Sequence, residues 1–402
     1  MSAPVQPAHP VNPNILATDA PAIVEAFRWL AEAKISDDKP LINVSQAAPV
    51  AAPHEDLRRF MAETVMNDVT SHLYGPDLGL PALRAELAAQ TGAHYGGQVS
   101  ADQVAITAGC NQAYTAAIAT LCAPGDEVIL PTPWYFNHKM WLDMAGIECR
   151  VLMCGEDMLP SAKEAGNLID NKVKAIVLVT PNNPCGVEYP PLLMDAFYDL
   201  VKAAGISLVV DETYRDFHSR TGAAHALFER LDWQNNLIQL YSFSKAYRLT
   251  GHRVGAVISS AKRLAEIEKF LDTLTICPNQ LGQRGALFGM RNLEGWLGNE
   301  RAEILGRRAA MVEGFKNLEG WKLKGCGAYF AYVSHPFLDS SDIVAQRLVK
   351  KASILALPGT MFSPILTKGG TGHAEAHFRI AFANIDRAEI GNLFKRLEAL
   401  DV

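Results

Sequence analysis

Between about residue 100 and residue 258, short apolar runs alternate with longer amphipathic stretches, and this pattern limits the possible folds most. Seven of the runs are rich in Val, Ile and Leu and are predicted strands: 103–107, 127–130, 148–153, 175–180, 207–210, 237–241 and 254–258. Stretches between them, such as 191–204, space their apolar residues as a helix does. Strands that are apolar on both faces and alternate with helices predict a mostly parallel sheet covered by helices on both sides.

The pattern changes after residue 290, where a long helical stretch at 294–318 is followed by shorter mixed elements. We therefore expect an α/β protein with two domains. The large domain, residues 49–293, is predicted to hold the mostly parallel seven-stranded sheet flanked by helices. A smaller α+β domain is expected at residues 294–402, with residues 1–48 forming an N-terminal arm and part of that small domain. Residues 1–20 are rich in proline and alanine and are predicted to be extended.

Composition argues against several classes of protein. The net charge is −6 and no long basic run occurs, so we expect no nucleic-acid partner. The apolar runs are too short to cross a bilayer, and the N-terminus lacks the pattern of a secretory signal. We expect a soluble, cytoplasmic protein without membrane contact. The seven cysteines are scattered, with no C-x-x-C pair, which predicts reduced thiols rather than disulfides.

One pair of histidines has the spacing of metal ligands. His373 and His377 are four residues apart, which would place both on one face of a helix. However, Gly-Gly-Thr-Gly precedes the pair and an apolar alternation follows it, so the segment is predicted to be a loop that enters a strand. We expect no metal site.

Five loops that follow predicted strands carry polar and reactive side chains. Ligands of open α/β sheets bind beyond the carboxyl ends of the strands, so these loops should share one edge of the sheet. They span residues 107–111, 131–135, 181–186, 211–214 and 242–245. Together they supply an acid, an amide, phenols, a hydroxyl and a lysine. Either of the bonds Thr132–Pro133 and Asn183–Pro184 could be cis, and the sequence leaves this open.

The last of these loops and the segment after it combine Ser242, Lys245 and Arg253. A lysine at a strand end that faces a cleft has its pKa lowered by burial and by a neighbouring cation, which makes it a usable nucleophile. Arg253 with Ser242 suits a phosphate. Either cation alone is more often an exposed surface residue, and the combination favours a site. Asp211, at the end of a buried strand, fits a cation partner and a helix N-cap equally well.

The same loops resemble the motifs of the class I and II pyridoxal-phosphate aminotransferases, which are fold type I enzymes like aspartate aminotransferase. Five segments carry the resemblance, in the family's order along residues 40 to 390: YGPDLGLPALR from Tyr74, NNPCG ending at Gly186, DETYRDF from Asp211, SFSKAYRLTGHRVG from Ser242, and HFRIAFAN from His377. Any one motif is weak evidence, whereas five in order are not a coincidence. The resemblance implies a transferase that uses pyridoxal 5'-phosphate to exchange an amino group between an L-amino acid and a 2-oxo acid in a ping-pong cycle.

The resemblance also assigns roles to individual residues. Lys245 would hold the cofactor as an aldimine and move the proton during catalysis, and Asp211 would pair with the pyridinium nitrogen. Tyr214 and Asn183 would bind the phenolate oxygen, and Arg379 the carboxylate of the substrate. The phosphate would be held by Ser242, by Arg253 and by the backbone at Cys110 and Asn111, where a helix begins. Tyr135 would stack on the ring, with Trp134 as the alternative. Tyr74 would reach the phosphate of a partner subunit, which implies a homodimer with shared active sites.

Three positions depart from the family's usual pattern. Cys185 stands where the family has threonine in N-N-P-T-G, and it is small enough to keep the turn. Ala47 stands where the family usually has a glycine near the substrate, so its methyl group could narrow the pocket. The stretch 273–280 lacks the arginine with which one aspartate aminotransferase subgroup binds a second carboxylate, which makes aspartate a less expected substrate.

Two other functions fit parts of the same sequence. A pyridoxal-phosphate lyase, such as a carbon–sulfur β-lyase or an aminocyclopropanecarboxylate-synthase-like enzyme, would use the same lysine, aspartate, tyrosine and arginine. A non-catalytic transcription regulator on this fold would need an N-terminal DNA-binding domain, and only about 40 residues that are not basic precede the resemblance here. The amino donor and acceptor are not indicated by the sequence.

Overall fold

The central sheet has seven strands in the order β2-β8-β7-β6-β5-β3-β4. The computed structural model describes residues 10–364 and 373–400. Its strands agree with the predicted ones to within two residues at each end: β2 (Val104–Thr107), β3 (Glu127–Thr132), β4 (Glu148–Met153), β5 (Val173–Val179), β6 (Ser207–Asp211), β7 (Leu237–Ser242) and β8 (Gly255–Ile258). All neighbours pair in parallel except β8, which runs antiparallel to both β2 and β7. The prediction of a mostly parallel seven-stranded sheet is confirmed.

Helices cover both faces of this sheet, and the side chains of each strand alternate between the two layers. On one face, Val209 of β6 belongs to a buried cluster with α5 (Cys110–Ala119), α6 (Phe136–Ala145) and α11 (Ala261–Thr275). On the other face, Leu208 and Val210 pack in a second cluster with α3 (Glu55–Asn67), α4 (Pro81–Tyr95), α8 (Pro191–Ala204) and α12 (Gln280–Asn292). Successive residues along β6 therefore point alternately toward one helical layer and the other.

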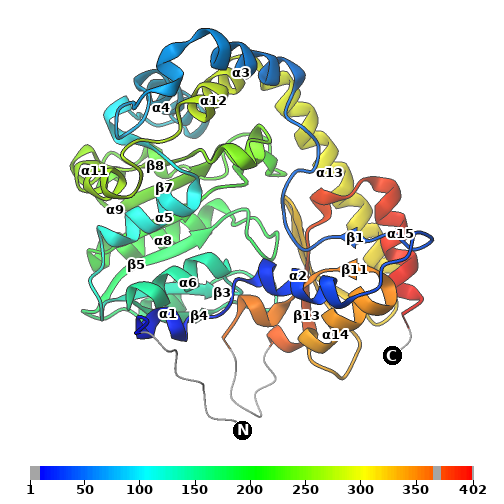
Figure 1. The fold of residues 1–402 in the computed structure, drawn as a ribbon. Coiled ribbons are helices and arrows are strands. Elements are labelled where there is room, and N and C mark those ends of the chain that lie inside the picture. Colours follow the sequence, from blue (N-terminus) through cyan, green and yellow to red (C-terminus); the bar gives the residue numbers. More distant parts are fainter. Residues whose placement is uncertain (1–9, 365–372, 401–402) are drawn as a thin grey trace.

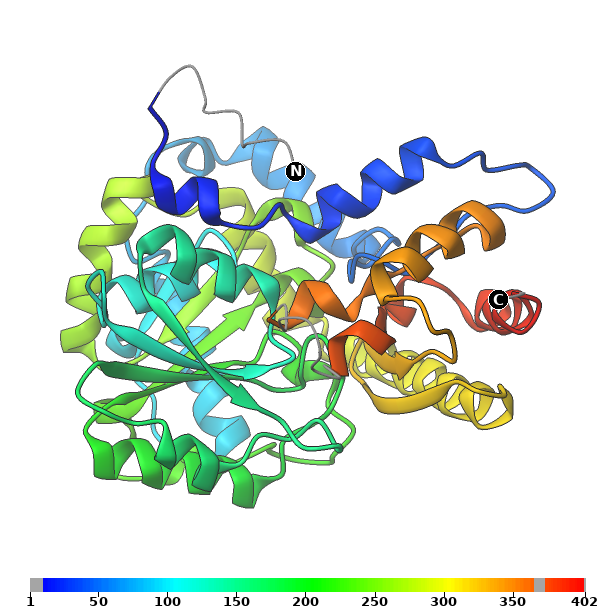
Figure 2. The same cartoon turned by 90° about the horizontal axis from the view of Figure 1, so that it is seen from below.

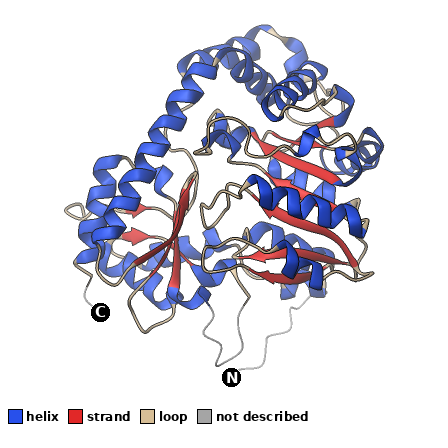
Figure 3. Ribbon diagram, turned by 180° about the vertical axis from the view of Figure 1, so that it is seen from behind, coloured by secondary structure: helices blue, strands red, loops and turns tan. Residues whose placement is uncertain are grey.

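The smaller domain is built on an antiparallel sheet in the order β12-β13-β10-β9. Its strands are β9 (Lys322–Gly327), β10 (Phe330–Ser334), β12 (Leu357–Pro358) and β13 (His377–Ile380). Three helices pack around it: α13 (Glu294–Asn317), α14 (Ser341–Arg347) and α15 (Arg387–Glu398). The long helix α13 leads from the large domain into the small one (Figure 1). Seen from behind, the two sheets lie on either side of the molecule, each with its own helices (Figure 3).

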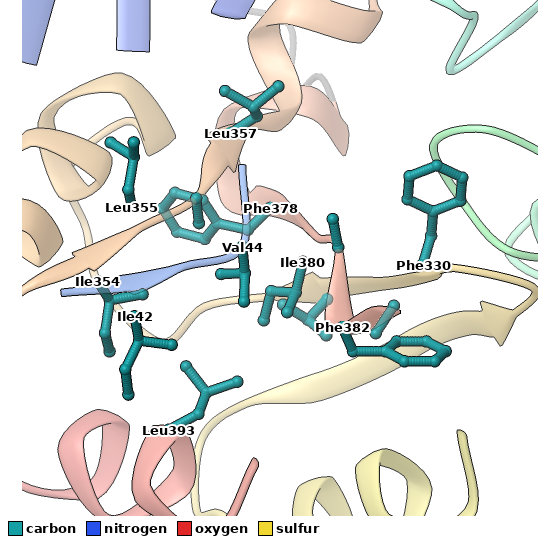
Figure 4. Close-up of a cluster of buried hydrophobic side chains, with 14 of the residues drawn as sticks. Ile42, Val44, Phe330, Ile354, Leu355, Leu357, Phe378, Ile380, Phe382 and Leu393 are labelled. Atoms are coloured by element: carbon teal, nitrogen blue, oxygen red, sulfur yellow. The ribbon is translucent and has the colours of Figure 1, made fainter. Parts of the chain in front are cut away.

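A segment from the N-terminal part of the chain completes the small domain. β1 (Ile42–Asn43) pairs in parallel with β11 (Ile354–Leu355). Ile42 and Val44 are buried in a cluster with residues of β13 and α15, including Ile380 and Leu393 (Figure 4). Residues 42–43 are thus paired with a strand that lies more than 300 positions later in the chain.

The prediction of an extended arm at residues 1–20 is wrong for part of its length. Residues 1–9 lie outside the described residues, but Pro13–Ala17 form the short helix α1. Asn12 caps this helix, because its side chain accepts a hydrogen bond from the Asn14 N–H (2.9 Å), and Pro13 occupies the first helical position, where proline is favoured. These local signals outweighed the overall proline content.

The N-terminal segment also runs from one domain to the other. α1 contacts α6 of the large domain, and α2 (Ala22–Glu32) packs against the small domain through Ala26 and Trp29. Figure 2 shows this segment running across the molecule from the large domain to the small one. Among the described helices, none is long and apolar enough to cross a membrane.

Candidate active site

A hollow of about 420 Å³ lies beyond the carboxyl ends of the parallel strands, at the edge expected from the sequence. Its walls come from the loops after β2, β3, β5, β6 and β7, together with β13, the segment after β1 and the start of α2. Eleven of the predicted site residues line it: Ala47, Cys110, Asn111, Tyr135, Asn183, Asp211, Tyr214, Ser242, Lys245, Arg253 and Arg379. Tyr74 does not line the hollow; it lies on the surface, 78 % exposed.

Lys245 lies in the single-turn helix α10 (Phe243–Ala246), which begins directly after β7. Its Nζ donates a hydrogen bond to the carbonyl oxygen of Ala47. Burial, with the positive charges of Arg253 and Arg379, lowers the pKa of the Lys245 amine to about 8. A larger share of this amine is therefore neutral at physiological pH than for an ordinary lysine, and only the neutral form is a nucleophile.

Asp211 is the last residue of β6 and is 4 % exposed. Its Oδ2 lies 3.2 Å from Nε2 of His138, and its Oδ1 accepts a hydrogen bond from the Thr213 N–H (2.9 Å). Burial alone would raise the pKa of this carboxyl, but the contacts with His138 and Thr213 hold it below its usual value. No helix begins at Asp211, so the structure excludes the N-cap role, and the carboxylate borders the hollow with His138 as its neighbour.

The start of α5 lies beside the guanidinium of Arg253. Gly109 precedes the helix with φ +87° and no side-chain cap, so the first N–H groups of α5 face the hollow without an intrahelical acceptor. A Cβ on Gly109 would lie 2.1 Å from Arg253 Nη2, and one on Gly255 would lie 2.5 Å from the Gly109 carbonyl carbon. The two glycines therefore let Arg253 approach the helix start. A helix N-terminus beside a guanidinium is suited to a phosphate.

The guanidinium of Arg379 lies in the middle of β13 and is almost fully buried. Nη1 donates to Asn183 Oδ1 (2.9 Å) and Nη2 to the carbonyl of Ser45. Nε has no hydrogen-bond partner in the described part of the chain. Burial lowers the pKa of Arg379 to about 10, against the opposing influence of Tyr214 and Tyr135. A buried guanidinium with a free donor suits a carboxylate ligand, which would restore its charge balance.

Two tyrosines face the same hollow. The hydroxyl of Tyr135 accepts from Asn137 Nδ2 (2.8 Å) and lies 3.4 Å from Asn111 Oδ1. Burial raises the pKa of Tyr135 to about 12 and that of Tyr214 well above its usual value, so both remain hydrogen-bond donors. Of the two rings proposed for stacking, Tyr135 lines the hollow. Trp134 instead borders a neighbouring hollow.

Several residues of the site were not anticipated from the sequence. Ser244, Thr250 and Thr213 line the hollow, and each lies within or beside a motif already identified, so the motifs could have indicated them. His138 had no such signal, since it lies inside α6 and meets Asp211 only through the fold. Pro21, Ile23 and Phe136 also line the hollow and had no signal beyond being apolar.

The two bonds left open by the sequence, Thr132–Pro133 and Asn183–Pro184, are both cis, and Thr180–Pro181 is cis as well. The histidine pair does not share a helix face, because His377 begins β13 and its ring stacks on Tyr332 (5.2 Å). Within residues 10–364 and 373–400, no group of three or more His, Cys, Asp or Glu side chains could hold a metal ion.

The chain is similar to known proteins in both sequence and structure. The family model described as aminotransferase class I and II matches residues 38–397. The aromatic aminotransferase ISS1 of Arabidopsis thaliana is 27 % identical over 393 residues, which cover 95 % of this chain and 94 % of that protein. An aspartate aminotransferase of Thermotoga maritima is 27 % identical over 292 residues, covering 72 % and 76 %.

Solved structures have the same fold. The aspartate aminotransferase of Thermus thermophilus with maleate superposes with a TM-score of 0.87 at 22 % identity, over 97 % of this chain and 99 % of that one. A protein of Escherichia coli, YbdL, described as having a methionine aminotransferase function, superposes with a TM-score of 0.85 at 23 % identity, over 98 % and 100 %.

Proposed function

Because this chain belongs to the class I and II aminotransferase family, whose members depend on pyridoxal phosphate, we propose that Lys245 carries this cofactor covalently. The chain is an aminotransferase. The proposed cycle has two half-reactions, in which an L-amino acid leaves as its 2-oxo acid and a second 2-oxo acid then leaves as an amino acid. The observation that carries the proposal is the meeting of Lys245, Asp211 and Arg379 in one hollow.

The side chains of the hollow fit this cofactor. The start of α5 with Arg253 would hold its phosphate, and the glycines at positions 109 and 255 let the Arg253 guanidinium lie close to the helix start. Asp211 is ionised and faces the hollow, as a partner of a protonated ring nitrogen must be. When bound, the cofactor supplies an electron sink for the carbanion formed when the substrate loses its Cα proton.

The residues of the chain would do the remaining work. Arg379 would bind the α-carboxylate and, with Asn183, fix the orientation of the Cα–H bond. Once the amino group of the substrate has displaced it from the cofactor, Lys245 would have a free amine with a pKa near 8, which would take the proton from Cα and pass it to the cofactor carbon C4′. Tyr214 stays protonated and would donate a hydrogen bond to the phenolate oxygen.

We also propose that the enzyme works as a homodimer. Large apolar side chains are exposed along the end of α3, the segment after it and the end of α11: Val65, Met66, Val69, Leu73, Tyr74, Leu274 and Ile276. The two segments contact each other, since the Gly75 N–H donates to Cys277 Sγ (3.3 Å). An apolar patch of this kind is typical of a protein interface. Tyr74 in this patch would then reach the phosphate in the partner's hollow.

The test is a UV–visible spectrum of the purified holoenzyme during addition of single amino acids. The proposal predicts a visible cofactor band that disappears with a donor amino acid and returns when a 2-oxo acid is added. A band that persists while pyruvate and ammonia accumulate would show a lyase instead. Failure to bind any cofactor after reconstitution would contradict the role of Lys245. Sedimentation of the same sample tests the dimer, which a mass of 43.8 kDa would contradict.

A further inference from the structure

We propose that the preferred substrates are amino acids with uncharged, mainly apolar side chains, and that Ile23 and Phe136 form the wall that selects them. This inference rests on the proposed placement of the cofactor at Lys245 and of the substrate carboxylate at Arg379. The argument concerns the part of the hollow that remains when the residues assigned to these two groups are set aside.

The part of the remaining wall that comes from the N-terminal segment, from the segment after β1 and from α6 is mainly apolar. It consists of Pro21, Ile23, Ala47, Ala48 and Phe136, with Gln46 and Asn137 as its polar members. The other unassigned lining residues come from β5 and from the segments after β6 and β7: Val179, Thr213, Ser244 and Thr250. Pro21 and Ile23 come from the start of α2, and Phe136 is the first residue of α6. Burial of an apolar side chain against such a wall is favourable because it removes apolar surface from water.

Every cation that lines the hollow already has a role. Lys245, Arg253 and Arg379 are the only lysines or arginines among its described lining residues, and they are assigned to the cofactor, its phosphate and the α-carboxylate. The side-chain carboxylate of aspartate or glutamate would therefore enter this wall without a positive partner. Burying an unpaired charge carries a large free-energy penalty.

The region behind Phe136 is acidic. A second hollow of about 610 Å³ shares Phe136 with the first, and its lining includes four acids and one lysine: Asp19, Asp143, Asp342, Glu375 and Lys139. Lys139 is already paired with Asp143, at 2.5 Å. A second carboxylate on the substrate would meet repulsion from this side rather than a counter-ion.

Aromatic rings lead from the wall to the carboxylate site. The ring of Phe136 lies 5.7 Å from that of Phe362, and the guanidinium of Arg379 lies 4.9 Å from the Phe362 ring. The Phe362 ring is fully buried and does not line the hollow, so of these two rings only Phe136 offers a surface to the side chain of a substrate held by Arg379. Aromatic pairs and aliphatic contacts in such a site favour phenylalanine, leucine or methionine.

The first experiment compares half-reactions of the holoenzyme by the change in its cofactor absorbance. We expect the specificity constant for phenylalanine, leucine or methionine to exceed those for aspartate and glutamate by at least about 10-fold. Equal or higher values for aspartate or glutamate would overturn the inference. If no amino acid reacts at all, the proposed function fails, and the binding experiment below still tests the wall.

Binding of unreactive acids gives that separate readout. Calorimetry of the holoenzyme with 3-phenylpropanoate and with succinate compares one carboxylate plus a ring with two carboxylates. The inference predicts a dissociation constant at least about 10-fold lower for 3-phenylpropanoate. Tighter binding of succinate would overturn it.

Substitutions at the wall locate the selectivity. Ile23→Arg adds a cation at the rim and should raise the specificity constant for aspartate relative to phenylalanine by about 10-fold or more, whereas the matched Ile23→Met variant should leave this ratio nearly unchanged. Phe136→Ala should weaken the binding of 3-phenylpropanoate more than the binding of succinate. If neither Ile23→Arg nor Phe136→Ala moves these ratios while the proteins remain folded, the wall does not select the substrate.

Discussion

Two neighbouring carboxylates at the end of β6 have opposite surroundings. The contrast distinguishes a residue with a proposed role in the reaction from one that stabilises the fold. Asp211 points toward α5 and α6, into the hollow, whereas Glu212 points to the other face of the sheet. Both are buried, both contact a histidine, and both have a pKa below the ordinary value. By residue type, burial and partner the two are nearly equivalent.

Glu212 is enclosed by its partners. It accepts hydrogen bonds from the Tyr95 hydroxyl (2.8 Å) and from Gln239, and it lies 3.2 Å from Nε2 of His225. Burial would raise the pKa of Glu212, but these contacts, chiefly that with His225, bring it to about 2. No hollow opens onto this cluster among those described. Asp211, in contrast, keeps one side toward open space, so a buried, paired carboxylate marks a site only where a ligand can reach it.

The largest effect on turnover is expected from removing the charge of Asp211, which faces the hollow. Asp211→Asn keeps the shape but takes away the ionised partner of the ring nitrogen, and turnover should fall by about a thousandfold. The free energy of unfolding should fall by less than in the Glu212→Gln variant below, because Asp211 borders the hollow and Glu212 is enclosed by Tyr95, Gln239 and His225. Steady-state kinetics and a denaturant titration of the same preparation check both statements. Turnover within tenfold of the wild type would contradict the role of Asp211.

The reverse outcome is expected for its neighbour. Glu212→Gln disturbs the enclosed cluster and should destabilise the fold by about 3 kcal/mol, since breaking a buried pair leaves its partner unsatisfied. The visible spectrum and the turnover of the folded enzyme should stay within about threefold of the wild type. Urea unfolding followed by circular dichroism measures the first effect. A large loss of turnover at unchanged stability would show that the two faces of β6 are not separate in function.

The pH dependence of that stability sharpens the contrast. Glu212 has a pKa of about 2 in the folded protein and 4.5 as its ordinary value, so its contribution is fully present above about pH 4.5 and is lost as the pH falls toward 2. The difference in unfolding midpoint between wild type and Glu212→Gln should therefore shrink between pH 5 and about pH 3. Glu319→Gln, at an exposed glutamate, serves as the control and should show no such trend. A difference that stays constant with pH would contradict the assignment.

The smallest effect is expected at Cys110, whose thiol lies 3.6 Å from Asp211 Oδ1. A thiol is a weak donor, so its contact should add little to those of His138 and Thr213. Cys110→Ala should change turnover by less than about threefold. Kinetics beside the His138→Ala variant, for which a larger loss is expected, would rank the two contacts. A larger loss for Cys110→Ala than for His138→Ala would contradict this ranking.

The sequence predicted the sheet and most residues of the hollow because both depend on patterns within short segments of the chain. Each strand of the large sheet is a continuous apolar run, and each loop after it carries its polar residues within a few positions of the strand end. The sequence could not distinguish Asp211 from Glu212 by itself, since two adjacent acids give no sign of which side of the strand is open. That distinction came from the family resemblance.

Contacts between segments that are distant in the chain could not be predicted from the sequence. His138 is 73 residues from Asp211 and meets it only because α6 packs on the same face of the sheet as the end of β6. Ile23 reaches the hollow because the N-terminal segment crosses from one domain to the other, and no local pattern in the sequence indicates that path. The antiparallel direction of β8 likewise depends on the route of the chain and not on the apolar run itself.

The central claim is that Lys245, in the hollow beyond the carboxyl ends of the strands, carries the cofactor. One measurement tests this claim directly. The holoenzyme is treated with borohydride, which fixes a lysine–cofactor bond, and is then digested for peptide mass spectrometry. The account predicts one modified peptide, with the cofactor mass on Lys245, and unmodified peptides for exposed lysines such as Lys269. A cofactor mass on another lysine, with Lys245 unmodified, would contradict it.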